Sequence, residues 1–209
     1  MNIVEFIRLN VVFKLPKSVA KKAISLSREI SKNNEALFVL DGIRFHPHIT
    51  IYSPEYPAKN LDKILQKVEE IVNKTKKPTL VFKKTDAHKG FIGIEFNCLT
   101  EIKKIHEMIV AELNPLREGH IREKYTNNDY KVGLVPEQQE NIKKYGYPDS
   151  MSLYIPHLTI IRLKDESLAE TILKEVRWGI PEFTVNKIAV YKMGKHGTCR
   201  ELVKETFLG

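Results

Sequence analysis

The sequence has no long hydrophobic run and little cysteine. No stretch approaches the roughly 18 consecutive apolar residues of a membrane span, so we expect no transmembrane segment and no membrane partner. Glu5 and Arg8 interrupt the apolar N-terminus, so we expect no signal peptide there. The only two cysteines, Cys98 and Cys199, are too few for a disulfide framework or a zinc cluster and suit a reducing compartment. We therefore expect a cytoplasmic protein.

Linkers and low-complexity tracts are also absent. No segment rich in proline, glycine and serine divides the 209 residues. Hydrophobic residues make up 42% of the chain and charged residues 29%, which is typical of soluble globular proteins. This composition excludes long disorder and fibrous repeats, and the length allows one large domain or two small lobes.

Acidic residues are fewer than basic ones. The chain has 34 lysines and arginines against 26 aspartates and glutamates, so its formal net charge is +8. Such an excess favours a polyanionic partner, whether nucleic acid, nucleotide or an anionic membrane surface. The count alone does not choose among them.

Apolar periodicity predicts alternating strands and helices. The expected strands cover residues 3–15, 43–53, 79–85, 91–97, 153–163, 183–193 and 200–207. The expected helices cover residues 17–33, 60–75, 100–113 and 166–177. The polar residues 115–150 form an insert without a clear pattern, and both a polar loop and a lid over a site are open for it.

Strands separated by helices, with a hairpin after the second helix of each half, indicate an α+β fold. We expect residues 1–209 to form a single bilobal domain with pseudo-twofold symmetry, each half of the chain providing one lobe. Two antiparallel sheets would face a central cleft, and helices would pack on the outer faces of the sheets.

One short motif occurs twice, once in each half of the chain. Residues 47–51 read Pro-His-Ile-Thr-Ile, and residues 156–160 read Pro-His-Leu-Thr-Ile. Because side chains alternate along a strand, the histidine and threonine of each copy project from one face and the apolar residues from the other. A pseudo-twofold fold would bring both pairs to one cleft. The four residues are His48, Thr50, His157 and Thr159.

Two histidines and two threonines have the chemistry of phosphodiester cleavage. Two imidazoles with pKa values near neutral pH can act as general base and general acid. Threonine hydroxyls can donate hydrogen bonds to the non-bridging phosphate oxygens. The scheme requires neither a metal nor a cofactor, and the other histidines do not have the spacing of zinc ligands. The sequence leaves open which histidine is the acid.

The paired His-x-Thr motifs resemble those of the 2H phosphoesterase superfamily, in particular the 2′-5′ RNA ligase-like and cyclic phosphodiesterase proteins. The segment Arg8–Pro16, followed by a helix, is also similar to the first strand of that family. The resemblance implies that His48 and His157 are catalytic and that Thr50 and Thr159 bind phosphate. It also implies a metal-independent hydrolase acting on RNA or a nucleotide with a 2′,3′-cyclic phosphate or a 2′-5′ linkage.

Strand parity and proximity to the motifs suggest further residues that could contact the substrate. These are Tyr52, His46, Asn10, Lys14 and Tyr191. For each of them a merely exposed position is the alternative. Tyr52 shares the face of the first motif and could stack on a base. Strict alternation along its strand would put Arg162 on the face that packs against the core, so we expect its side chain to emerge at the edge of its lobe.

Basic and aromatic residues are interleaved in the insert and could clamp a single-stranded nucleic acid. They are His120, Arg122, Lys124, Tyr125, Tyr130, Lys143, Lys144, Tyr145 and Tyr147. The alternative to an enzyme is a non-catalytic RNA- or nucleotide-binding protein that uses the same cleft. In either case we expect a monomer, because two internal lobes can build the site without a second chain.

Overall fold

The computed structural model describes residues 4–127, 130 and 133–209. Its strands are β1 (Phe6–Lys14), β2 (Ala36–Val39), β3 (His48–Tyr52), β4 (Glu55–Pro57), β5 (Thr79–His88), β6 (Phe91–Phe96), β7 (His157–Leu163), β8 (Glu182–Thr184), β9 (Lys187–Met193) and β10 (Cys199–Phe207). Its main α-helices are α1 (Lys17–Ser31), α2 (Leu61–Val72), α3 (Thr100–Leu113), α5 (Pro136–Tyr145) and α6 (Ala169–Leu173). No helix within these residues is long and apolar enough to span a bilayer.

The predicted order of strands and helices is confirmed, except that the insert contains the helix α5, which was not predicted, and that several short elements differ. β2 and β4 are only four and three residues long, too short to show a period in the sequence. The prediction of one strand over residues 183–193 is wrong. This segment contains β8, which pairs with β5, and β9, which pairs with β1 near the other end of the sheet.

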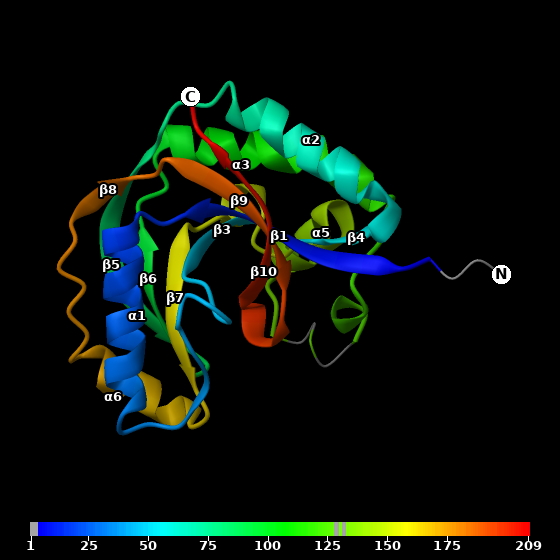
Figure 1. The fold of residues 1–209 in the computed structure, drawn as a ribbon. Helices are drawn as coiled ribbons and strands as arrows, with labels where there is room; N and C mark the ends of the chain where they lie inside the picture. The colour runs from blue at the N-terminus through cyan, green and yellow to red at the C-terminus, as the bar shows by residue number, and fades with distance from the viewer. Residues whose placement is uncertain (1–3, 128–129, 131–132) are drawn as a thin grey trace.

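All the strands above belong to one curled antiparallel sheet (Figure 1). The strand order is β10-β9-β1-β3-β7-β6-β5-β8, with β2 on β7 and β4 on β1. This order is symmetric about the two strands that carry the motifs, β3 and β7. The α+β fold is therefore confirmed, and the two expected sheets are joined edge to edge where Ile49 pairs with Leu158.

Helices cover the sheet on both sides of this junction. On one side, helices α2 and α3 pack against each other; α3 packs on β3, and α2 packs on β10 (Figure 1). On the other side, α1 packs on β7 and β2, and α6 packs on β5 and β6. Each lobe thus combines segments from both halves of the chain. The expectation that each half provides one lobe is wrong, because α1 follows β1 directly and yet packs on the lobe of β7.

The helices attach to the sheet through apolar residues at helical spacing. On α1 the buried apolar residues recur every three or four positions, which places them on one face. They are Val19, Ala23, Leu26 and Ile30. On α2 the corresponding residues are Ile64, Val68 and Val72. The other side of the sheet is left to carry polar side chains, including those of the motifs.

Candidate active site

Each motif strand contains a β-bulge directly after its His-x-Thr sequence. The pairing of β3 with β1 skips Ile51, and the pairing of β7 with β6 skips Ile160. A bulge interrupts the alternation of side chains along a strand. In agreement with this, Ile51 and Tyr52 are both fully buried, as are Ile160 and Ile161. The two copies of the motif therefore share a feature that their sequences do not display.

The bulges overturn two expectations that assumed strict alternation. Tyr52 is fully buried, and its hydroxyl donates a hydrogen bond to the carbonyl oxygen of Tyr145, so its ring is not available to stack on a base. On β7 the bulge returns Arg162 to the face of His157. Arg162 lines the cleft on this face, and its guanidinium lies 4.5 Å from the ring centre of Phe91.

The two motif histidines are oriented in the same way. Nδ1 of His48 lies 2.8 Å from the carbonyl oxygen of His46, and Nδ1 of His157 lies 2.9 Å from that of Ile155. A carbonyl oxygen only accepts hydrogen bonds, so each Nδ1 carries a proton and donates it. Nε2 of each ring is thereby the atom left to exchange a proton with a substrate.

The proline of each motif explains this shared orientation. Pro47 and Pro156 each follow the residue whose carbonyl accepts the bond from the histidine. Proline fixes its own φ, and it confines the preceding residue to extended conformations. The backbone that enters β3 or β7 therefore has few conformations, and the carbonyl is held beside the imidazole.

The pairing of β3 with β7 brings the two motifs side by side. Ile49 lies opposite Leu158 in antiparallel register. Continued by one residue on either side, this register sets the histidine of each strand opposite the threonine of the other, and opposite side chains share a face. The four side chains that converge in this way are His48, Thr50, His157 and Thr159.

His48 is held in its neutral form. Burial, together with the nearby His157, His46 and Arg8, lowers its pKa to about 4, against the raising effect of the hydrogen bond to the His46 carbonyl. The influence of His157 on this pKa places the two imidazoles within electrostatic range of each other. A neutral imidazole with a free Nε2 can accept a proton at neutral pH.

Asn10 of β1 orients Thr50 and does not face the open cleft. Asn10 is completely buried, and its Nδ2 donates to Oγ1 of Thr50 at 2.9 Å and to Sγ of Cys199 at 3.6 Å. Since Oγ1 of Thr50 accepts this bond, the hydroxyl proton of Thr50 remains available for a phosphate oxygen. Strand parity placed Asn10 on the correct face, but its contact is with Thr50.

The other three candidates lie around the first motif. The ring of Tyr191 is buried, with its centre 5.1 Å from that of His46. The backbone of His46 pairs with Cys199. Lys14 forms an ion pair with Glu205 of β10. These three residues support the segment that leads into β3. Among the described residues that line the cleft, none of the three occurs.

A cleft of about 1030 Å³ lies on the motif face. β7 contributes His157, Thr159 and Arg162, and β1 contributes Arg8, whose charge also acts on His48. His48 and Thr50 of the first motif are not among the described residues that line the cleft. The insert forms much of the remaining wall. Its lining residues include Arg122, Lys124, Tyr125, Tyr130 and Tyr147.

Other residues singled out in the insert do not line the cleft. Nε2 of His120 lies 2.7 Å from the carboxylate of Glu55, and its ring stacks on Phe6 with ring centres 3.7 Å apart. Lys143 and Lys144 of α5 are exposed. The insert thus has one part that faces the site and one that faces solvent.

His106 of α3 supports β3 from the core side, a role that the sequence did not reveal. It is completely buried; its Nδ1 donates to the carbonyl oxygen of Ile51 at 2.7 Å, and its Nε2 accepts from the backbone N–H of Met151 at 2.8 Å. Its ring stacks on Tyr154, whose hydroxyl donates to the carbonyl oxygen of Thr50 at 3.0 Å. A histidine among the apolar positions of the predicted helix was the available signal.

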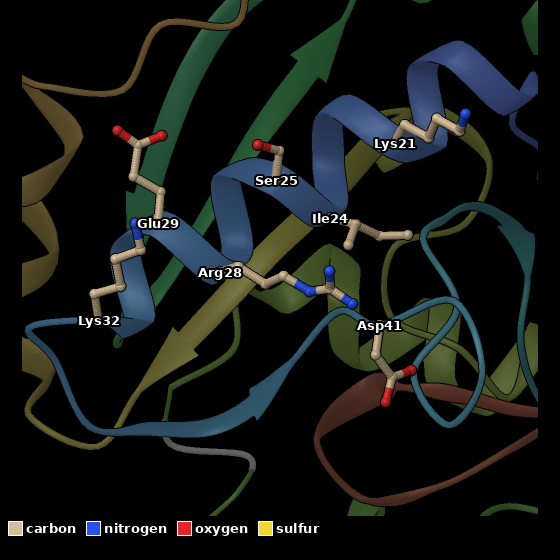
Figure 2. Close-up of a pocket in the computed structure, with 7 residues that line it drawn as sticks. All are labelled: Lys21, Ile24, Ser25, Arg28, Glu29, Lys32 and Asp41. Carbon is tan, nitrogen blue, oxygen red and sulfur yellow. The ribbon is translucent and has the colours of Figure 1, made fainter.

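A second hollow, of about 540 Å³, lies along α1. In Figure 2, Arg28 extends from α1 toward Asp41, and Lys21 and Ser25 lie farther along the helix. The carboxylate of Asp41 already accepts hydrogen bonds from the backbone N–H groups of residues 43–45. Neither motif reaches this hollow, so the cleft on the motif face is the candidate active site.

Residues 41–197 match the family model of the 2′-5′ RNA ligase superfamily. The match includes both motifs and well over half of the chain. The chain belongs to this superfamily. The resemblance drawn from the two His-x-Thr motifs is thereby confirmed, and membership of a superfamily of phosphoesterases and ligases points to an enzyme.

Solved structures share the fold of this member of the superfamily. Escherichia coli LigT complexed with NADP+ is 13% identical, with a TM-score of 0.56 over 98% of this chain and 99% of that chain. LigT complexed with 3′-AMP is 12% identical, with a TM-score of 0.55 over 98% of both chains. TT0787 of Thermus thermophilus is 12% identical, with a TM-score of 0.58 over 96% of this chain and 97% of that chain. No match was found among the curated proteins.

Proposed function

We propose that this superfamily member is a metal-independent phosphodiesterase that opens 2′,3′-cyclic phosphates or cleaves or joins 2′-5′ linkages in RNA or nucleotides. The observation that supports this most is the convergence of two His/Thr pairs in which each histidine has a free Nε2. His48 and His157 would be catalytic, and Thr50 and Thr159 would bind the phosphate. One chain supplies both pairs, which supports action as a monomeric bilobal domain.

Acid–base chemistry at phosphorus follows from this geometry. His48, neutral at pH 7, would take a proton through Nε2 from the attacking water. A new bond would form between the water oxygen and phosphorus as one P–O bond of the cyclic phosphate breaks, and His157 would protonate the leaving oxygen. Thr50 and Thr159 would donate to the non-bridging oxygens, where negative charge grows. In the ligation direction the histidines would exchange roles.

Turnover in the presence of EDTA tests the proposal. Purified protein should hydrolyse adenosine 2′,3′-cyclic phosphate or a 2′-5′-linked diadenosine. Chromatography of the reaction products measures the turnover. His48→Ala and His157→Ala should each lower kcat/KM by about 10²- to 10⁴-fold, since each removes a proton-transfer group. His120→Ala is the matched control, because His120 lies outside the cleft.

Full activity in both motif variants would contradict the proposal. Salt-dependent RNA binding without turnover of either substrate would instead indicate a non-catalytic binding protein that uses the same cleft.

A further inference from the structure

Three cationic side chains gather in the cleft beside the second motif. Arg8 comes from β1, and Arg122 and Lys124 come from the insert at the short 3₁₀ turn Glu123–Tyr125. None of the three forms an ion pair with another described residue. They therefore differ from Arg162, which forms an ion pair with Glu166 at 3.2 Å.

The charges of the three side chains act on one another. Burial, followed by the charges of Arg122 and Arg8, lowers the pKa of Lys124 to about 8. Burial and the charge of Arg122 likewise lower the pKa of Arg8. Like charges that are partly removed from water raise the free energy of the charged forms. An anion bound between them would relieve this cost.

The carboxylates around these cations have other partners: of those that line the cleft, Asp86 and Glu95 form ion pairs with Lys84. Asp149 raises the pKa of Lys124, but its Oδ1 accepts a hydrogen bond from Gln138 at 2.9 Å. Glu55 raises the pKa of Arg8, but its Oε2 lies 2.7 Å from His120. Neither acid neutralises the three cations by direct contact.

The cations are held in ways that leave donors free. Nη1 of Arg8 donates to the carbonyl oxygen of Gly194 at 3.2 Å, while its Nε is buried without a partner among the described residues. Nζ of Lys124 lies 4.4 and 4.7 Å from the ring centres of Tyr125 and Tyr130. Aromatic faces orient an ammonium group without cancelling its charge. The arrangement is therefore suited to receive an anion.

Arg8 connects this group to the motif histidines. It lines the same cleft as His157 and Lys124, and its charge acts on both His48 and Lys124. We propose that Arg8, Arg122 and Lys124 form a second phosphate subsite, which holds a phosphate group adjacent to the one that reacts. The inference rests on the proposed function for the reacting phosphate. It makes substrates with two phosphate groups the preferred ones.

Two sources can supply the second phosphate: the 3′-5′ phosphodiester of an RNA strand and the 5′-phosphate of a mononucleotide. Three substrates that end in a 2′,3′-cyclic phosphate separate them: adenosine, 5′-phosphoadenosine and the dinucleotide ApA. We expect kcat/KM to be at least about 10-fold higher for a substrate with two phosphates than for adenosine 2′,3′-cyclic phosphate, a preference of the size of one charge-assisted contact. A higher kcat/KM for the 5′-phosphorylated mononucleotide or for the dinucleotide identifies which of the two sources supplies the second phosphate.

Variants of the insert carry the kinetic test. Arg122→Ala and Lys124→Ala should reduce the preference for two phosphates toward unity. Lys143→Ala is the matched control, since its side chain is exposed on α5 and pairs with Glu140 at 2.6 Å. Equal kcat/KM for all three substrates, or an unchanged preference in Arg122→Ala and Lys124→Ala, would overturn the subsite.

Equilibrium binding tests the subsite independently of turnover. By calorimetry, ApAp, which ends in a 3′-phosphate, should bind at least about 10-fold more tightly than adenosine 3′-phosphate. Arg122→Ala should lower the slope of log affinity for ApAp against log salt by about 0.7, the value for one phosphate contact in a single strand. If these results hold while neither a 2′,3′-cyclic phosphate nor a 2′-5′ linkage is turned over, the subsite stands and the proposed function fails. Equal affinity for the two ligands would overturn the subsite.

Discussion

At the scale of single residues, the orientation of Thr50 depends on a buried amide. Asn10 donates to Oγ1 of Thr50, while its own Oδ1 is buried without a partner among the described residues. An unpartnered buried oxygen destabilises the fold. We infer that Asn10 is retained for the position of the hydroxyl and contributes little to stability.

Replacement of this amide separates the two roles. In Asn10→Leu we expect kcat to fall about 10-fold, because the hydroxyl of Thr50 loses the bond that orients it. The free energy of unfolding should change by less than about 1 kcal/mol, since the substitution removes the unpartnered oxygen together with the donor. Steady-state kinetics and urea denaturation of the same preparation measure both quantities. Unchanged kcat would show that Thr50 needs no support from Asn10.

At the scale of elements, β3 is tied to α3 and to the end of the insert through His106. The neutral ring donates through Nδ1 to the bulge residue Ile51 and accepts through Nε2 from Met151. Burial lowers the pKa of His106 to about 4, whereas in the unfolded chain it has its ordinary value near 6.5. Protonation would remove the acceptor for Met151, so the neutral form is the one that fits.

The pH dependence of stability follows from this difference in pKa. At pH values above the pKa of His106 in the unfolded chain, His106 is neutral in both the folded and the unfolded state. Its contribution to the free energy of unfolding is then constant. As the pH falls toward about 5, the unfolded state binds a proton at His106 that the folded state does not, and the contribution of His106 to the free energy of unfolding should fall by about 2 kcal/mol. Urea denaturation at about pH 7.5 and 5 measures this change. In His106→Gln the pH dependence should be smaller; an equal dependence would assign it to other groups.

At the scale of the whole molecule, the two lobes are interleaved along the chain. β1, β3, β9 and β10 form one side of the sheet, and β5 to β8 form the other, so the chain crosses between the sides several times. Neither half of the sequence contains a complete lobe. We therefore expect the lobes to unfold together, as small single domains do.

The single tryptophan provides a local probe of this cooperativity. Trp178 is buried in the lobe of β5 to β8, with its ring centre 6.4 Å from that of Phe96. Its fluorescence reports that lobe, whereas far-ultraviolet circular dichroism reports both. The two urea transitions should coincide in midpoint and slope. A circular dichroism transition that precedes or follows the fluorescence change would show that the lobes unfold separately.

Local patterns predicted much of this molecule. The strand periodicity of β1, the helical spacing of α1 and the repeated motif are each visible within a short window of sequence. Helix α5 lacks clear apolar periodicity, but its ends carry sequence signals: it begins with Pro136 and ends before Gly146, whose φ is +68°. Tyr52 and Arg162 were misplaced because a bulge is set by pairing with a neighbouring strand.

The sequence by itself determined the fold class, the family resemblance and the two His/Thr pairs, because these depend on residue type and on spacing along the chain. Only the tertiary structure decided what surrounds the pairs. The bulges, the bond from Asn10 to Thr50 and the gathering of Arg8 with Arg122 and Lys124 join residues far apart in sequence. Contacts of this kind arise from strand register and packing, which no local pattern specifies.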